Sequence, residues 1–175
     1  MHIRTAANTD LNRIMDLYHE AADAMVKTPY DCCWRKDGHP TNDFVRSIIE
    51  SGIMLIALDN DQLIAAVGID HDLGHDYGDL RWLVDVPVSQ AAVIHLLVVK
   101  EGWRGNGISR HLLRACLSKA RELGMRTARL DATANNAPAI SLYHSEGFSQ
   151  VGAGIQDVGP DDDPHVPFVV LERLL

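Results

Sequence analysis

An expected strand, a glycine turn and a helix start follow one another between residues 93 and 109. The apolar run over 93–99 predicts a buried strand, and an amphipathic helix is predicted from residue 108 to Gly124. The first N–H groups of a helix have no intrahelical acceptor and lie at its positive end. Gly105 and Gly107 place no side chain that would keep an anion from these donors. The segment is predicted either to bind an anionic group or simply to connect the two elements.

The common nucleotide-binding patterns do not describe this turn. The dinucleotide pattern G-x-G-x-x-G requires a third glycine where this chain has Arg110. A P-loop ends in Gly-Lys-Ser or Gly-Lys-Thr, and the sequence contains no such triplet. The segment instead resembles R/Q-x-x-G-x-G/A, the acyl-CoA pyrophosphate loop of the GNAT N-acetyltransferase superfamily. Arg104 and Gly107 fill its first two fixed positions, and Ser109 replaces the final Gly or Ala.

A second segment resembles another pattern of the same superfamily, N-x-x-A-x-x-L-Y-x-x-x-G-F. Its fixed positions are filled by Asn136, Ala139, Leu142, Tyr143, Gly147 and Phe148. Residues 130–133 are typical of the end of a strand, Asn136 is suited to cap the next helix, and Pro138 is tolerated in its first turn. Two motifs in this order, about thirty residues apart, make the resemblance specific.

The resemblance implies a fold, an activity and a cofactor site. The activity is transfer of an acetyl group from acetyl-CoA, as co-substrate, to a primary amine by direct attack in a ternary complex, without a metal. No cysteine occupies a motif position where an acyl-enzyme would form. The implied cofactor-binding residues, several acting through their backbone, are Leu97, Val98, Val99, Arg104, Gly105, Asn106, Gly107, Ile108, Ser109, Arg110, Asn136 and Tyr143.

Three side chains are candidates for proton transfer. Tyr143 is the candidate acid for the departing thiolate, although a tyrosine on a helix can also serve only as packing. Asp131 is the first candidate base, because some N-terminal-amine acetyltransferases of the superfamily place a carboxylate there. His95 is the second, since histidine titrates near neutral pH, but a lone histidine among apolar residues is more often part of a core. A chain of water molecules is the third possibility.

Other residues have weaker signals. Trp34 and Trp82 lie in irregular segments where pockets are often built, and each is a candidate for substrate binding or for simple packing. His71 and His75 lie among aspartates, but Gly74 between them favours a solvated loop over a metal site. The acidic run 161–163 is expected to face solvent.

Composition limits the class of protein. The 175 residues are 46% hydrophobic and 23% charged, as expected for one globular domain over 1–175. A net charge of −8 argues against nucleic acid as a partner, and no apolar run is long enough for a bilayer. Three cysteines, two of them adjacent, do not form a disulfide framework. We expect a cytoplasmic protein that acts on a small-molecule or peptide amine, and the resemblance makes a homodimer one option.

The order of expected elements predicts an α/β (α+β) fold of the GNAT type. It comprises a mixed, mostly antiparallel sheet of six or seven strands flanked by about four helices. The expected strands are 2–6, 53–58, 63–69, 93–99, one ending at 133, 148–153 and 167–173, and the expected helices are 11–25, 41–52, 108–123 and one starting at 136. Residues 71–90 and 155–166 have no counterpart in the motifs.

Two alternatives belong to other classes of protein. A GNAT-like domain can bind acyl-CoA as a non-catalytic sensor or docking module, which needs neither Tyr143 nor a nearby carboxylate. A nucleotide-binding regulator would bind ATP or NAD rather than CoA. The chain matches neither the dinucleotide pattern nor the P-loop, which argues against this alternative. The presence of Tyr143 and Asp131 favours the enzyme.

Overall fold

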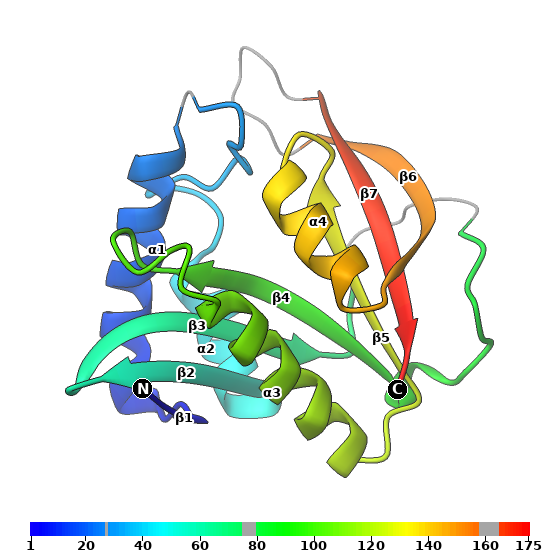
Figure 1. Ribbon diagram of the computed structural model, residues 1–175, viewed down its shortest axis with the longest axis horizontal. Coiled ribbons are helices and arrows are strands. Elements are labelled where there is room, and N and C mark those ends of the chain that lie inside the picture. The colour runs from blue at the N-terminus through cyan, green and yellow to red at the C-terminus, as the bar shows by residue number, and fades with distance from the viewer. Residues whose placement is uncertain (27, 75–79, 158–164) are drawn as a thin grey trace.

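The computed structural model describes residues 1–26, 28–74, 80–157 and 165–175. Within these ranges, four α-helices surround a single seven-stranded sheet (Figure 1). The strands are β1 (His2–Thr5), β2 (Ile53–Asp59), β3 (Gln62–Asp70), β4 (Ala91–Val99), β5 (Thr127–Thr133), β6 (Ser149–Asp157) and β7 (His165–Leu174). The helices are α1 (Leu11–Met25), α2 (Asn42–Ser51), α3 (Ile108–Glu122) and α4 (Ala137–Ser145). The predicted mixed, mostly antiparallel sheet with four helices is confirmed.

The sheet separates between its two central strands. Its order is β1-β2-β3-β4-β5-β7-β6, and β4–β5 is the one parallel pair among the described strands. This parallel ladder ends where Val93 pairs with Arg129, although β4 continues to Val99 and β5 to Thr133. Beyond that pair the two strands diverge, as Figure 1 shows. The backbone of β4 therefore has no β5 partner over its last six residues.

Helices cover both faces of the β1–β4 half of the sheet. Helices α1 and α2 pack against one face through a cluster that includes Ile14, Tyr18 and Ile48. Helix α3 covers the other face through Leu112, Leu113 and other apolar residues at helical spacing. Helix α4 follows β5 and contributes Tyr143 to the α3-side cluster.

A bulge in β4 changes which side chains face the two helix layers. Gly68 of β3 pairs with His95, and Ala66 pairs with Val98, so two β4 residues lie opposite Val67. The bulge residue Leu96 has a φ of 59°, and its carbonyl accepts a hydrogen bond of 3.0 Å from the Tyr18 hydroxyl. Leu96 consequently packs in the α1-side cluster instead of following Ile94 to the α3 side. Bulges of this kind redirect side chains near functional sites.

Several predicted boundaries differ from the structure. The central strand begins at Ala91 rather than residue 93, and the strand expected over 148–153 runs to Asp157. The helix expected from residue 41 begins at Asn42, and Thr41 caps it, because its hydroxyl accepts a hydrogen bond of 3.2 Å from the Phe44 N–H. The strands expected at 53–58 and 63–69 are β2 and β3, which pair antiparallel as a hairpin.

Candidate active site

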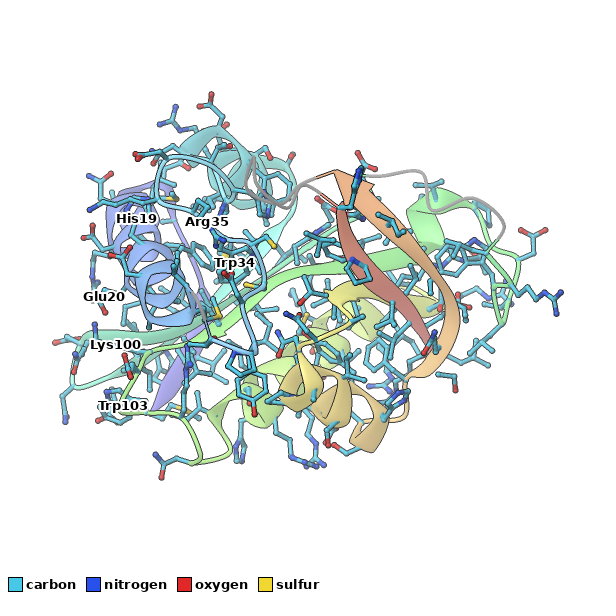
Figure 2. The ribbon with its side chains drawn as sticks, turned by 90° about the horizontal axis from the view of Figure 1, so that it is seen from above. His19, Glu20, Trp34, Arg35, Lys100 and Trp103 are labelled. Carbon is cyan, nitrogen blue, oxygen red and sulfur yellow. The ribbon has the colours of Figure 1, made fainter. Side chains whose placement is uncertain are left out.

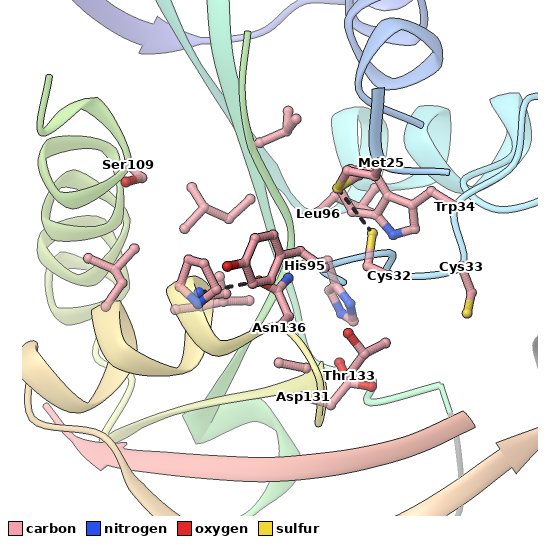
Figure 3. Close-up of a pocket in the computed structure, with 18 of the residues that line it drawn as sticks. Met25, Cys32, Cys33, Trp34, His95, Leu96, Ser109, Asp131, Thr133 and Asn136 are labelled. Carbon is pink, nitrogen blue, oxygen red and sulfur yellow. Dashed lines mark hydrogen bonds between the residues drawn. The ribbon is translucent and has the colours of Figure 1, made fainter. Parts of the chain in front are cut away.

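A cavity of about 1140 Å³ lies where β4 and β5 diverge. At one end, which we call the helix end, it is lined by Arg104, Gly105, Ile108 and Ser109 from the start of α3. At the other, the strand end, it is lined by Asp70, His95, Asp131, Thr133 and Gln156. Figure 3 shows Ser109 on one side of this space and Asp131 with Thr133 on the other. Leu97, Val98, Val99, Asn136 and Tyr143 line the space as well.

The helix end has the geometry of an anion site. Gly105 and Gly107 have φ values of 82° and 75°, a left-handed conformation that glycine adopts without a steric penalty. Gly107 is the N-cap of α3, so the free N–H groups of the first helical turn follow it directly. A Cβ atom at Gly105 would meet no heavy atom within 4 Å, so this side of the turn is open. These residues fit the pyrophosphate of an acyl-CoA.

Arg104 and the loop before it are fixed to the rest of the fold. The Arg104 Nε donates to the Val99 carbonyl at 3.2 Å, and the Lys100 N–H donates to the Ile64 carbonyl at 2.8 Å. The Lys100 side chain forms an ion pair with Glu20 of α1, and these two residues lie close together in Figure 2. The turn is thus held from the strand on one side and from α1 on the other.

Three of the predicted cofactor residues do not line the cavity, namely Asn106, Gly107 and Arg110. The Arg110 guanidinium donates to Glu146 at 2.9 Å, and Arg114 also binds this carboxylate. These contacts hold the pKa of Glu146 below its usual value, the hydrogen bond from Arg114 having the largest effect. Arg110 can therefore contribute to cofactor binding only through its backbone, in the first turn of α3.

Tyr143 and Asn136 reach the cavity from α4. The Asn136 side chain caps this helix by accepting a hydrogen bond of 3.3 Å from the Ala139 N–H. Tyr143 is buried, with its ring 5.9 Å from that of Phe148. Burial raises the pKa of the Tyr143 phenol well above its ordinary value, and the negative charge of Asp131 raises it further. The phenol is therefore protonated at neutral pH and has a proton to donate.

His95 is paired with a carboxylate that the sequence analysis did not identify. Its Nε2 lies 2.8 Å from Asp70 Oδ1, and its ring meets Phe44 edge to face at 5.5 Å. Asp70 pairs with Val93 and Gly68 pairs with His95, so the two side chains are diagonal neighbours on one face of the sheet. No signal in the sequence links Asp70 to His95, because the pairing register of β3 with β4 decides their contact.

Residues 31–34 pass beside the cavity and bring Cys32, Cys33 and Trp34 to its lining. The Asn135 amide donates to the Asp31 carbonyl at 3.2 Å, which joins this segment to the loop after β5. Trp34, a predicted substrate residue, meets Tyr18 edge to face at 5.4 Å. Burial raises the pKa of the Cys32 thiol to about 12, so this sulfur is protonated at neutral pH.

Trp82, the other predicted substrate residue, lies outside the cavity lining. The Arg129 guanidinium carbon is 3.8 Å from the centre of its ring, and Trp82 packs on the cluster formed by β6 and β7. His71 is exposed, with Nδ1 2.7 Å from the Ala91 carbonyl, whereas His75 and residues 161–163 lie outside the described residues. In the part of the chain that the structure describes, no three His, Cys, Asp or Glu side chains are grouped to hold a metal ion.

Comparison with known proteins gives the family. The model of the acetyltransferase (GNAT) family matches residues 13–148, which is most of the chain. The chain belongs to the GNAT acetyltransferase family. This is the family that the sequence motifs predicted, and its name agrees with the predicted class of activity.

Individual relatives agree with this assignment. Streptothricin acetyltransferase of Streptomyces lavendulae is 39% identical over 90 residues, covering 50% of this chain and 44% of that protein. The chain thus matches less than half the length of this curated relative. The ribosomal-protein-alanine N-acetyltransferase of Brucella melitensis has the same fold, with a TM-score of 0.72 and 19% identity over all of both chains. The yncA protein of Salmonella typhimurium, solved with its cofactor acetyl-CoA, has a TM-score of 0.74 and 19% identity, covering 100% of this chain and 94% of that one.

The described helices include none that combines the length and apolarity needed to cross a membrane.

Proposed function

We propose that this acetyltransferase transfers the acetyl group directly to a primary amine while both substrates occupy the cavity. The observation that carries this proposal is the continuity of the cavity between the helix end and the strand end. The amine nitrogen attacks the thioester carbonyl carbon, the carbon–sulfur bond breaks, and the nitrogen loses a proton. Backbone groups of Leu97, Val98 and Val99, which β5 leaves unpaired, are suited to bind the pantetheine amides and polarise the thioester carbonyl.

Tyr143 is the proposed acid for the departing thiolate. Its raised pKa keeps the phenol protonated, and its side chain lines the cavity. A thiolate needs a well-placed proton donor more than a strong one. The buried phenol meets that requirement.

His95 and Asp131 are the two candidate bases. Asp70 supports His95, because a carboxylate bonded to one ring nitrogen orients the ring and fixes which nitrogen is free. Asp131 also lines the strand end, but its charge acts on Tyr143. The contact with Asp70 makes His95 the better supported base.

Two further features support a direct transfer to an amine. The Cys32 thiol is protonated, which makes it a poor nucleophile for an acyl-enzyme. Asp70, Asp72 and Asp131 line the cavity away from Arg104, so a cationic amine is attracted to the end where it must react. The relatives named above act on an antibiotic and on a ribosomal-protein alanine, which favours a small-molecule or peptide amine for this chain.

The test of this function is release of CoA thiol from acetyl-CoA in the presence of a panel of primary amines. We expect amine-dependent release and an acetylated product with a mass increase of one acetyl group. CoA binding without amine-dependent release from any member of the panel would instead support a non-catalytic binding module.

The two candidate bases predict opposite pH–rate profiles for the variants His95→Gln and Asp131→Asn. If His95 is the base, His95→Gln lowers kcat by about 10²- to 10⁴-fold and removes the acidic limb of the rate profile, while Asp131→Asn keeps that limb. If Asp131 is the base, the two variants exchange these outcomes. Should both keep the full profile, the amine loses its proton to solvent and the site acts by positioning and electrostatics.

A further inference from the structure

Two buried polar atoms at the strand end of the cavity have no hydrogen-bond partner among the described residues. They are Thr133 Oγ1 and Gln156 Nε2. The two residues are only 2% and 7% exposed, and both line the cavity. Because an unsatisfied buried polar group destabilises the folded state, native proteins keep few of them. Two such groups at one end of a ligand cavity indicate that a ligand supplies their missing partners.

The sheet places these groups on one face. Thr133 pairs with Phe168 of β7, which pairs with Gly154 of β6, and Gln156 lies two residues beyond Gly154. Asp131, two residues before Thr133, shares this face because side chains alternate along a strand. Figure 3 shows Asp131 and Thr133 together, away from Ser109. An acceptor molecule entering this end of the cavity would therefore meet the carboxylate and both unsatisfied groups.

A second threonine on the same strand shows that the fold can satisfy a buried hydroxyl. Thr127 is fully buried on the same face of β5, and its Oγ1 bonds Glu172 at 2.8 Å and the Arg173 carbonyl at 3.0 Å. Thr133 differs in facing the cavity. The missing partner is thus a property of the cavity wall and not of threonine in this strand.

We propose that Thr133 and Gln156 bind a carboxamide group of the acceptor, so that the preferred substrate is a primary amine that also carries an amide. The unsatisfied atom of Gln156 is a donor and needs an acceptor such as a carbonyl oxygen. The Thr133 hydroxyl both donates and accepts, so it can receive the amide N–H. One amide group complements both side chains. This inference rests on the proposed transfer to an amine.

The test compares ω-amino amides with alkylamines of matched length. We measure kcat/KM for each pair in the wild type, Thr133→Val and Gln156→Met. The wild type should prefer the amino amide by about tenfold or more, and each substitution should reduce this ratio by about tenfold, the size expected for one lost hydrogen bond. The matched control is Gln150→Met, which removes an exposed amide from the same strand and should leave the ratio unchanged.

Each alternative result has a definite meaning. Equal kcat/KM for the two series, or variants that keep the wild-type ratio, would overturn the inference, as would a preference for amino alcohols over amino amides. Calorimetry with the CoA-bound protein separates this inference from the proposed function. If no amine is acetylated but amino amides bind selectively and the two variants lose that selectivity, the proposed function fails and the amide site stands.

Discussion

The two ends of β5 use similar polar residues for different purposes. At its start, Thr127 and Arg129 both donate to the buried Glu172 carboxylate, at 2.8 and 2.9 Å, and Arg129 also donates to the Val84 carbonyl at 3.2 Å. At its end, Asp131 and Thr133 face the cavity, and the Thr133 hydroxyl has no partner among the described residues. The start of the strand is closed and satisfied, whereas its end is open to a ligand.

The difference follows from where the sheet separates. The β4–β5 ladder ends at the pair Val93–Arg129, between the two groups of residues. Before that point the strand is covered by residues 80–84, including Trp82 over Arg129. After it the neighbouring strand moves away. We infer that stability is concentrated at the closed end and chemistry at the open end, and four predictions test this division.

The largest effect is expected from Tyr143→Phe at the open end. Loss of a general acid should lower kcat by about 10²- to 10⁴-fold. Affinity for acetyl-CoA, measured by calorimetry, should stay nearly intact because the ring remains. Wild-type turnover in this variant would remove Tyr143 from the mechanism.

A substitution at the closed end of β5 should lower the stability of the fold. Arg129→Met leaves the Glu172 carboxylate buried without its cation, so we expect the free energy of unfolding to fall by about 3–5 kcal/mol in urea titrations. The matched control is Lys119→Met, which removes a partly exposed partner of Glu122 and should change stability by less than about 1 kcal/mol. If both variants were equally stable, the closed end would not be the stabilising region.

Gly107→Val tests the helix end of the cavity. A branched side chain in the left-handed conformation at the first turn of α3 should weaken CoA binding by about tenfold or more, and binding of dephospho-CoA to the same extent. Gly102→Val is the control for backbone strain, because Gly102 has a similar φ of 81° in the same loop but lies outside the motif. Normal affinity of the Gly107 variant for both ligands would place the pyrophosphate elsewhere.

The smallest effect separates the two threonines of β5. Thr127→Val leaves Glu172 without one donor and should lower the free energy of unfolding by about 1–2 kcal/mol. Thr133→Val loses no hydrogen bond and should leave stability unchanged or slightly higher. Equal losses in both variants would show that Thr133 has a structural partner in solution.

Much of the helix end follows from the sequence. Gly105 and Gly107, the helix after them, the Asn136 cap and Tyr143 were all identified from short patterns. Turn, cap and helix signals depend on neighbouring residues, so they can be recognised without knowing the fold. The single domain, the cytoplasmic location, the homodimer and the site roles stay predictions.

The residues that meet at the strand end of the cavity could not be predicted from the sequence. The pairing of His95 with Asp70, the placement of Cys32 beside the cavity and the unsatisfied Gln156 each join segments far apart in the chain. The β4 bulge also has no sequence signal, yet it decides which face Leu96 joins. The sequence by itself determined the family and predicted the cofactor loop and the acid candidate, because these are local motifs. Only the tertiary structure decided which polar groups meet at the acceptor end, because strand register and the separation of β4 from β5 bring them together.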